Sequence, residues 1–268
     1  MALNKPSSPT PIEQNSAAIA EIQSLVDGLP SVGAGTSATE PYIEETYDSN
    51  KNLTGVVLHG YTLVRKYLFE GCTQLVSMTL SDGITSIENS AFYACTKLAL
   101  TSLPAGITSI ASSAFYGCTN LALTSLPAGI TSIESSAFYG CTNLALTSLP
   151  AGITSIESSV FHNCTHLALT SLPDGITSIG DSAFYRCSYL ALTSLPSGIT
   201  SIGRTAFAGC VRLTSITFNG TPDSIGSNAF LTCTNLTSIK VPWAEGAVAG
   251  APWGATKATI TYNYTGEG

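Results

Sequence analysis

The sequence has few charged residues and no long apolar run, and each absence excludes a class of protein. Only 10% of the 268 residues are charged, with 10 Lys and Arg against 17 Asp and Glu. Binding to nucleic acid needs a stripe of Lys and Arg that neutralises phosphates, and the sequence has none. It also has neither a basic patch suited to an anionic membrane nor the roughly 20 consecutive apolar residues that cross a bilayer. We therefore predict no nucleic-acid partner and no membrane partner.

Motifs for catalysis and cofactor binding are absent as well. The eight cysteines include no CxxC pair, which argues against a zinc site, and they are too sparse for a small disulfide scaffold. The segment from His162 to His166 contains two His and Cys164, but Cys164 occupies a repeat position that we expect to be buried. No His lies in a nucleophile–base setting. The sequence therefore predicts a protein that is not an enzyme and has no metal site and no cofactor.

A repeat of 23 residues fills most of the chain. One Phe recurs at this interval and a Cys follows each Phe by three residues, at Phe69, Phe92, Phe115, Phe138, Phe161, Phe184, Phe207 and Phe230 and at Cys72, Cys95, Cys118, Cys141, Cys164, Cys187, Cys210 and Cys233. A fixed period of this length is typical of a solenoid, in which each unit buries its apolar face against its neighbours. The Cys positions indicate a column of small buried side chains. Neighbouring thiols would lie about 5 Å apart, which allows oxidative pairing without implying it.

The unit 121–143 illustrates the local structure that we expect in each repeat. Residues 121–126 alternate small and apolar side chains and favour a short strand, which ends at a Pro-Ala-Gly turn at 127–129. Residues 130–133 form a second extended segment, and 135–141 suit one helical or 3-10 turn that buries the Phe and the Cys. The predicted fold class is a β-rich repeat solenoid with a parallel strand ladder and short helical or 3-10 turns, plus a short N-terminal helix.

The run F-x-x-C-x-x-L, followed by a strand, a Pro-Gly turn and Ile-Thr-Ser-Ile, resembles the BspA-like class of leucine-rich repeats over about 70% of the chain. The resemblance implies a leucine-rich-repeat stack. One departure is visible, because the usual strand reads L-x-x-I from Leu213 to Ile216, whereas the middle repeats read Leu121-Ala-Leu123. The apolar residue has moved by one place, so we expect a bulged or re-registered strand there, with the ladder preserved.

Four segments are predicted along the chain: a helical attachment segment at 1–29, an acidic flexible linker at 30–51, the solenoid at 52–241 and a C-terminal cap at 242–268. Thr10 begins the helix as part of a capping box. The heptad pattern of this predicted helix allows the helix to pack on the solenoid or on another protein, or to self-associate as a homo-trimer. The cap contains Trp243 and Trp253 and a final strand near 258–264, and residues 53–64 are expected to close the opposite end.

Candidate binding residues are those that differ between otherwise similar repeats, because a stacked core leaves little room for variation. They directly follow the Phe, at Tyr93, Tyr116, Tyr139, His162 and Tyr185, or lie two places beyond the Cys, at Asn120, Asn143, His166, Tyr189 and Arg212. The first series predicts a ladder of rings that either shields the turn below it or contacts sugar faces or a protein partner. The face around Ala122 and Thr124 is a second, flatter candidate.

The resemblance to BspA-like proteins implies a surface protein that mediates adhesion to host proteins, cells or other microbes. The N-terminal residues 1–9 lack the apolar core of a secretory signal. A short anchor at 1–29, an acidic linker and a rod suggest a phage virion fibre or decoration protein that binds a host-surface protein or glycan. The alternatives are a bacterial surface or secreted adhesin and an intracellular interaction scaffold. The expected location is accordingly a virion, a cell surface or the extracellular space.

Overall fold

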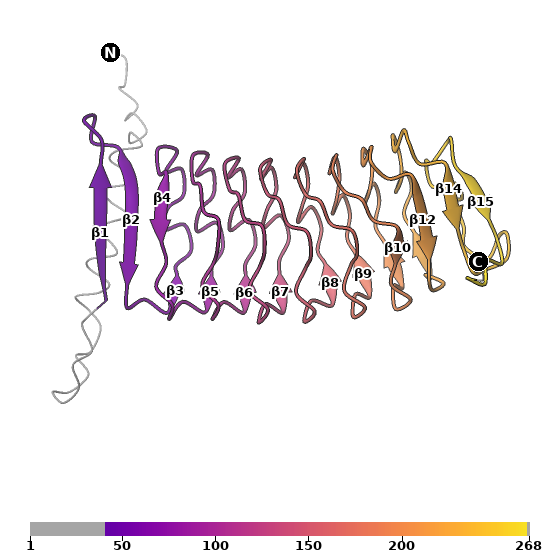
Figure 1. Cartoon of the computed structure of the whole chain (residues 1–268), viewed down its shortest axis with the longest axis horizontal. Helices are drawn as coiled ribbons and strands as arrows, with labels where there is room; N and C mark the ends of the chain where they lie inside the picture. Colours follow the sequence, from indigo (N-terminus) through magenta and orange to yellow (C-terminus); the bar gives the residue numbers. More distant parts are fainter. Residues whose placement is uncertain (1–40, 267–268) are drawn as a thin grey trace, which may run out of the picture.

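Short parallel strands stack along the chain and form a solenoid, as Figure 1 shows. The computed structural model describes residues 41–266. Most rungs contribute a two-residue strand, and these strands are β3 (Leu63–Val64), β5 (Ser86–Ile87), β6 (Ser109–Ile110), β7 (Ser132–Ile133), β8 (Ser155–Ile156), β9 (Ser178–Ile179), β11 (Ser201–Ile202) and β13 (Ser224–Ile225). They pair in parallel as β3-β5-β6-β7 and β13-β11-β9-β8. The predicted solenoid fold class is confirmed.

A second group of strands lies only toward the two ends of the stack. At one end, β1 (Tyr42–Tyr47), β2 (Leu53–His59) and β4 (Ser77–Thr79) form a sheet. At the other, β10 (Ser194–Leu195), β12 (Ser215–Phe218), β14 (Ser238–Lys240) and β15 (Thr259–Thr261) form another. The strand expected at 121–126 is absent from the middle repeats. A single rung-to-rung bond remains there, such as Ala122 N–H to the Leu100 carbonyl at 3.0 Å.

The moved leucine explains why this ladder is lost. Leu121 and Leu123 are both buried, as alternation requires, but Thr124 and Ser125 are then both exposed before Leu126 turns inward again. Two consecutive outward side chains are incompatible with the period of two that defines a strand. In β12, by contrast, Ile216 and Phe218 alternate with half-buried neighbours. The expectation that the ladder would survive the shift is therefore wrong for the middle repeats.

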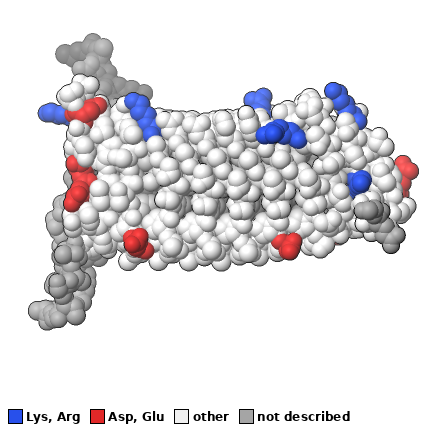
Figure 2. Space-filling view, viewed as in Figure 1, with Lys and Arg blue, Asp and Glu red and all other residues white. Residues whose placement is uncertain are grey.

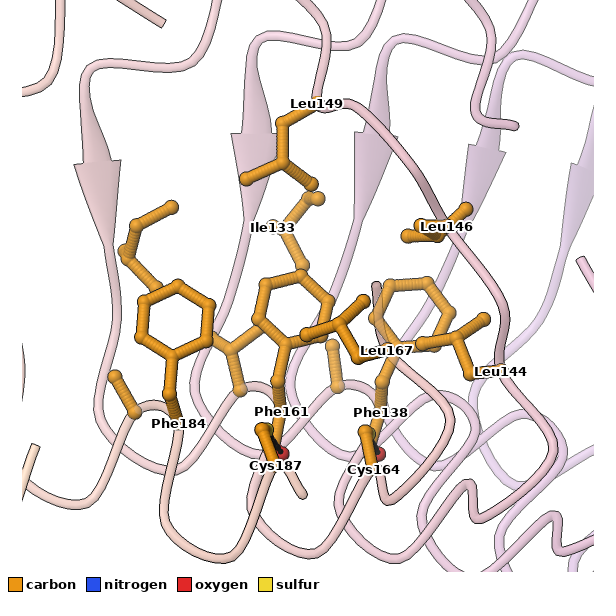
Figure 3. Packing of buried hydrophobic residues seen from close by; sticks show 14 of the residues in the cluster. Ile133, Phe138, Leu144, Leu146, Leu149, Phe161, Cys164, Leu167, Phe184 and Cys187 are labelled. Carbon is orange, nitrogen blue, oxygen red and sulfur yellow. Dashed lines mark hydrogen bonds between the residues drawn. The ribbon is translucent and has the colours of Figure 1, made fainter. Parts of the chain in front are cut away.

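The core is a continuous stack of apolar side chains through every rung. Consecutive Phe rings lie nearly parallel, with centroids 5.2 Å apart for Phe92 and Phe115 and 5.8 Å apart for Phe138 and Phe161. Figure 3 shows leucines from the same rungs packed beside these rings. The Phe and Cys positions are all buried. The register that predicted the solenoid thus identifies its core.

The seven cysteines from Cys95 to Cys233 each donate a hydrogen bond to a carbonyl of the rung before. The Cys141 thiol donates to the Phe115 carbonyl at 3.0 Å, and Cys164 and Cys187 donate in the same way to Phe138 and Phe161. Figure 3 shows the last two beside the main-chain oxygens that accept these bonds. The seven cysteines from Cys95 to Cys233 form no disulfide. The predicted column of buried side chains is confirmed, and its thiols have a role that size alone does not explain.

The turn that carries the Phe is a chain of tight turns rather than a regular helix. Ala137, Tyr139 and Cys141 each donate a backbone hydrogen bond to the residue three places earlier. Ser136 and Gly140 nevertheless have φ values of 59° and 71°, and such left-handed residues interrupt helical geometry. Gly suits the second position because it has no Cβ. Within residues 41–266 no helix is long and apolar enough to span a membrane.

The N-terminal end of the stack differs from the expected linker. Residues 42–47 form β1, which pairs antiparallel with β2, so the interpretation of 30–51 as a flexible linker is wrong for this part. Tyr, Ile and Thr favour strands, and Ile43 packs against the core while Tyr42 stacks on His59 at 4.2 Å. The acidic residues obscured this pattern in the sequence. The end of the described stack is therefore β1, and the predicted helix at 1–29 lies outside the described residues.

The C-terminal end is closed by aromatic side chains and a last strand. Trp243 and Trp253 are buried, and Phe218 contacts the Trp243 ring edge-on at 5.2 Å. Strand β15 adds to β14 in parallel, with Ile239 opposite Ile260. The two Trp rings also contact each other, with centroids 6.4 Å apart. Large rings thus cover the apolar end that the last Phe rung would otherwise expose to water.

Candidate interaction surface

The candidate residues lie on one corner of the solenoid, in the turn between the Phe and the following strand. In Figure 1 this corner forms the upper edge, directly before β12 and β14. Backbone bonds hold successive corners in register, because Phe115 N–H donates to the Ala137 carbonyl at 2.8 Å and Gly117 N–H to the Tyr139 carbonyl at 2.7 Å. The corner is therefore a third hydrogen-bonded ladder, and it fixes side chains of successive repeats in straight columns.

The residues that directly follow each Phe form the ring column, which comprises Tyr93, Tyr116, Tyr139, His162 and Tyr185. Their rings stack nearly parallel, with consecutive centroids 4.2 to 4.8 Å apart. All five are half-buried. Because each ring covers the face of its neighbour, the column presents ring edges and polar atoms to solvent. The predicted ladder is present, but its ring faces are not available to a ligand.

Burial and close packing alter the ionisation of this column. The pKa of Tyr116 is raised, chiefly by burial and further by the neighbouring Tyr139 and Tyr93. The pKa of His162 is lowered, first by burial and then by the charge of Arg186. Both shifts favour the neutral form of the ring. Tyr116 and His162 are consequently uncharged near neutral pH.

The column ends at Tyr185, because the next repeat has a buried Ala208 in place of a ring. Arg186 occupies the space instead, with its guanidinium carbon 5.3 Å from the Tyr185 centroid, within the range of a cation–π contact. Our sequence analysis did not select Arg186. The signal was present, since Arg186 stands where several other repeats have a glycine, as at Gly117, Gly140 and Gly209. Arg186 keeps the positive φ of that position, 57°.

The residues two places beyond each Cys form the outer column, which comprises Lys97, Asn120, Asn143, His166, Tyr189, Arg212 and Asn235. All seven are exposed. His166 Nδ1 lies 2.6 Å from the Thr142 carbonyl, so this nitrogen carries the proton and donates. The His166 ring stacks on the Tyr189 ring with a centroid distance of 5.3 Å. The guanidinium carbon of Arg212 lies over the Tyr189 ring, 5.0 Å from its centroid. The ten predicted site residues thus lie in two adjacent columns of one corner.

Charge is distributed unevenly around the rod. Figure 2 shows the Lys and Arg side chains between the two ends along the upper edge, and the acidic side chains along the lower edge. Some carboxylates elsewhere on the rungs accept hydrogen bonds from backbone N–H groups. Glu134 accepts from Ser112 N–H at 3.0 Å, and Asp181 accepts from Arg204 N–H at 2.7 Å. From residue 92 to residue 236 the Phe-to-Leu turns contain Lys97, Arg186 and Arg212 and no acidic residue, so this part of the corner is locally basic although the chain as a whole carries a net charge of −7.

The His162–His166 segment does not converge on a common point. Cys164 is buried and its thiol bonds to Phe138, whereas His166 is exposed and His162 stacks between two tyrosines. Among residues 41–266 no group of three or more His, Cys, Asp or Glu could hold a metal ion. The flatter candidate face has an open groove of about 590 Å³ in earlier repeats, lined by residues 76–80, 82 and 99–105. This lining contains Ala99 and Thr101, the repeat equivalents of Ala122 and Thr124.

The repeat pattern matches the family model of the BspA type leucine rich repeat region over residues 42–168 and 166–245, in six copies. The chain belongs to this family. BspA-type proteins are typically surface-exposed or secreted proteins without enzymatic activity, and an interaction role is consistent with that. No curated protein matches the chain significantly.

Solved structures share the BspA-type fold. A leucine-rich repeat protein from Bacteroides ovatus is 22% identical with a TM-score of 0.57, covering 78% of this chain and 60% of its own. A leucine rich cell surface protein from Faecalibacterium prausnitzii is 22% identical with a TM-score of 0.56, and the match covers 77% of this chain and 72% of that protein. The T. pallidum leucine rich repeat protein is 26% identical with a TM-score of 0.53, and the match covers 75% of this chain and 91% of that protein. This chain thus spans 60% of the length of the B. ovatus protein.

Proposed function

We propose that the protein is a non-catalytic recognition protein that binds a host-surface protein or glycan through the corner formed by the ring column and the outer column. The observation that carries the proposal is where the repeats differ. The buried Phe, Cys, Leu and Ile positions hardly vary, whereas the corner changes from Asn143 to His166 to Tyr189 to Arg212 on consecutive rungs. A surface maintained only for stacking has no need of such side chains, and Tyr and Arg are enriched in protein interfaces.

The shape of the corner supports recognition rather than catalysis. Its side chains lie on an open ridge, and the carboxylates on the neighbouring rungs are bonded to backbone N–H groups. Catalysis by paired carboxylates or by a nucleophile needs groups that converge in an enclosed site. A straight ridge with rungs repeating at about 4.8 Å instead offers many weak contacts to an extended partner.

Where the protein is displayed forms the second part of the proposal. The sequence layout, with an attachment segment at 1–29, favours a virion fibre or decoration protein. The similarity to a cell surface protein of F. prausnitzii favours a bacterial surface adhesin. Mass spectrometry of purified phage particles and of cell-wall, secreted and cytosolic fractions distinguishes the two. Detection in the cytosolic fraction alone would contradict both and would support an intracellular scaffold.

Direct binding measurements test the recognition function itself. We expect the labelled full-length protein to bind at least one member of a panel of intact bacterial cells, host cells, extracellular proteins and glycans. The binding should be saturable and competed by unlabelled protein, because it involves a defined surface. A reversed-sequence or heat-denatured control distinguishes this from non-specific adsorption. Absence of saturable binding across the panel at micromolar concentrations would reject the proposed function.

A further inference from the structure

Two arginines and two aromatic rings meet on the corner between residues 185 and 212, and nothing in the core requires them. Arg186 lies over Tyr185 and Arg212 lies over Tyr189, with guanidinium-to-centroid distances of 5.3 and 5.0 Å. His166 stacks on the opposite side of Tyr189. We call these five side chains the cationic patch. Tyr189 is 46% exposed, so the patch is open to a partner.

The arginines of the cationic patch have no acidic partner within residues 41–266. The one ion pair of the described chain joins His59 to Glu44, at the N-terminal end of the stack. The nearest acidic side chain in sequence, Asp181, accepts a backbone bond from Arg204 instead. An exposed guanidinium held over a ring keeps its five donors free for a planar carboxylate. The patch is therefore suited to binding an anion.

Stacking in the ring column decides which kind of anionic partner fits. Sugars bind aromatic side chains through ring faces, but the faces from Tyr93 to Tyr185 cover one another at 4.2 to 4.8 Å. Arg186 covers the last face. What remains are ring edges, which carry partial positive charge, and hydroxyl and guanidinium donors. This array matches the carboxylates of Asp and Glu side chains better than it matches the apolar face of a sugar.

We propose that Arg186, Arg212, Tyr185, Tyr189 and His166 form a docking site for an acidic peptide segment of a protein partner. This inference rests on the proposed recognition function and names the chemistry of its partner. Tyr185, Arg186 and Tyr189 lie in the turn of one rung and Arg212 lies in the turn of the next, so an extended segment crossing the ridge meets both Arg–Tyr pairs. Acidic side chains along the lower edge of the rod, visible in Figure 2, lie away from this route.

Fluorescence anisotropy with a labelled peptide of alternating Glu and Ser tests the site directly. We expect the full-length protein to bind this peptide more weakly as salt rises, because exposed charge pairs are screened. The double variant Arg186→Gln, Arg212→Gln should lose at least tenfold in affinity. The matched double variant Arg65→Gln, Lys66→Gln removes two exposed positive charges that lie outside both columns, and it should bind as the wild type does.

Three results would overturn the docking site. These are no binding of the acidic peptide, equal affinity of the double variant and the wild type, and tighter binding of a polyuronate than of the peptide. The last result would assign the patch to an acidic glycan. Circular dichroism of each variant establishes that it is folded. If the panel of cells, proteins and glycans still binds the protein while the peptide does not, the recognition function stands and only the acidic-peptide site fails.

Discussion

Replacing Phe138 with alanine is expected to lower the free energy of unfolding by about 3–5 kcal/mol, because it leaves a cavity in the middle of the stack. Phe138 is fully buried, and its ring centroid lies 5.5 Å from that of Phe115 and 5.8 Å from that of Phe161. A rung in a solenoid contacts only its two neighbours, so no distant side chain can move in to fill the space. Urea unfolding followed by circular dichroism measures the loss.

The neighbouring Tyr139 provides the matched control. Its ring stacks between Tyr116 and His162 at 4.4 and 4.2 Å, but it is half-buried and outside the core. Tyr139→Ala is expected to cost about 1–3 kcal/mol, because it loses two ring contacts worth about 0.5–1.5 kcal/mol each but leaves no enclosed cavity. If both variants lost the same amount, the separation between a stacking core and a recognition surface would be contradicted.

Raising the pH above about 9 is expected to unfold the protein, because its buried thiols resist ionisation. Burial raises the pKa of all eight cysteines, and it does so to about 11 for Cys233. An unfolded cysteine has a pKa of about 8.5. Above that pH the unfolded chain releases thiol protons that the folded chain retains. The contribution of the thiols to stability is therefore fully present below about pH 8.5, and it is lost as the pH rises toward the pKa values of the cysteines in the folded chain.

The expected effect is large because the thiols act together. A thiol that stays protonated in the folded chain contributes up to about 1.4 kcal/mol per pH unit above the unfolded pKa, so the column together gives on the order of several kcal/mol per unit. This is comparable with the whole stability of a typical domain. Urea unfolding in a phosphine reductant at pH 7 to 9.5 measures the dependence. A free energy of unfolding that stays constant over that range would contradict the burial of the column.

A variant with fewer thiols provides the control for the alkaline prediction. Cys141→Ala with Cys164→Ala removes two titrating groups, so the fall in stability per pH unit should be less steep by about 2.7 kcal/mol. The Phe115 carbonyl that accepts from the Cys141 thiol also accepts from Cys118 N–H at 3.1 Å. That second bond keeps the carbonyl satisfied, and the variant should fold at pH 7.

The interval between Phe residues predicted the solenoid and its core because stacking admits few side chains at each buried position. The same reasoning could not predict the thiol–carbonyl bonds, since a small apolar residue would satisfy the volume equally well. Nor could it predict the loss of the ladder at 121–126. There Leu123 lies one place earlier than the strand pattern requires, and only the structure shows that Thr124 and Ser125 then both face solvent.

The candidate site was predictable in its residues but not in its geometry. Variation between repeats selected Tyr185, His166, Tyr189 and Arg212, and the fold places them on one corner. The sequence did not reveal that stacking at 4.2 to 4.8 Å hides the ring faces, because that follows from the close spacing of successive corners. Arg186 escaped selection because its position is one of small residues in most other repeats.

The most direct test of the account compares the wild type with the triple variant Tyr116→Ser, Tyr139→Ser, Tyr185→Ser on a surface that the wild type binds. The account places recognition on the corner and stability in the buried Phe and Cys columns. It predicts that the variant keeps the circular dichroism spectrum of the wild type and loses at least tenfold in affinity for that surface. Unchanged affinity in a variant that remains folded would contradict the account and remove the ring column as the binding site.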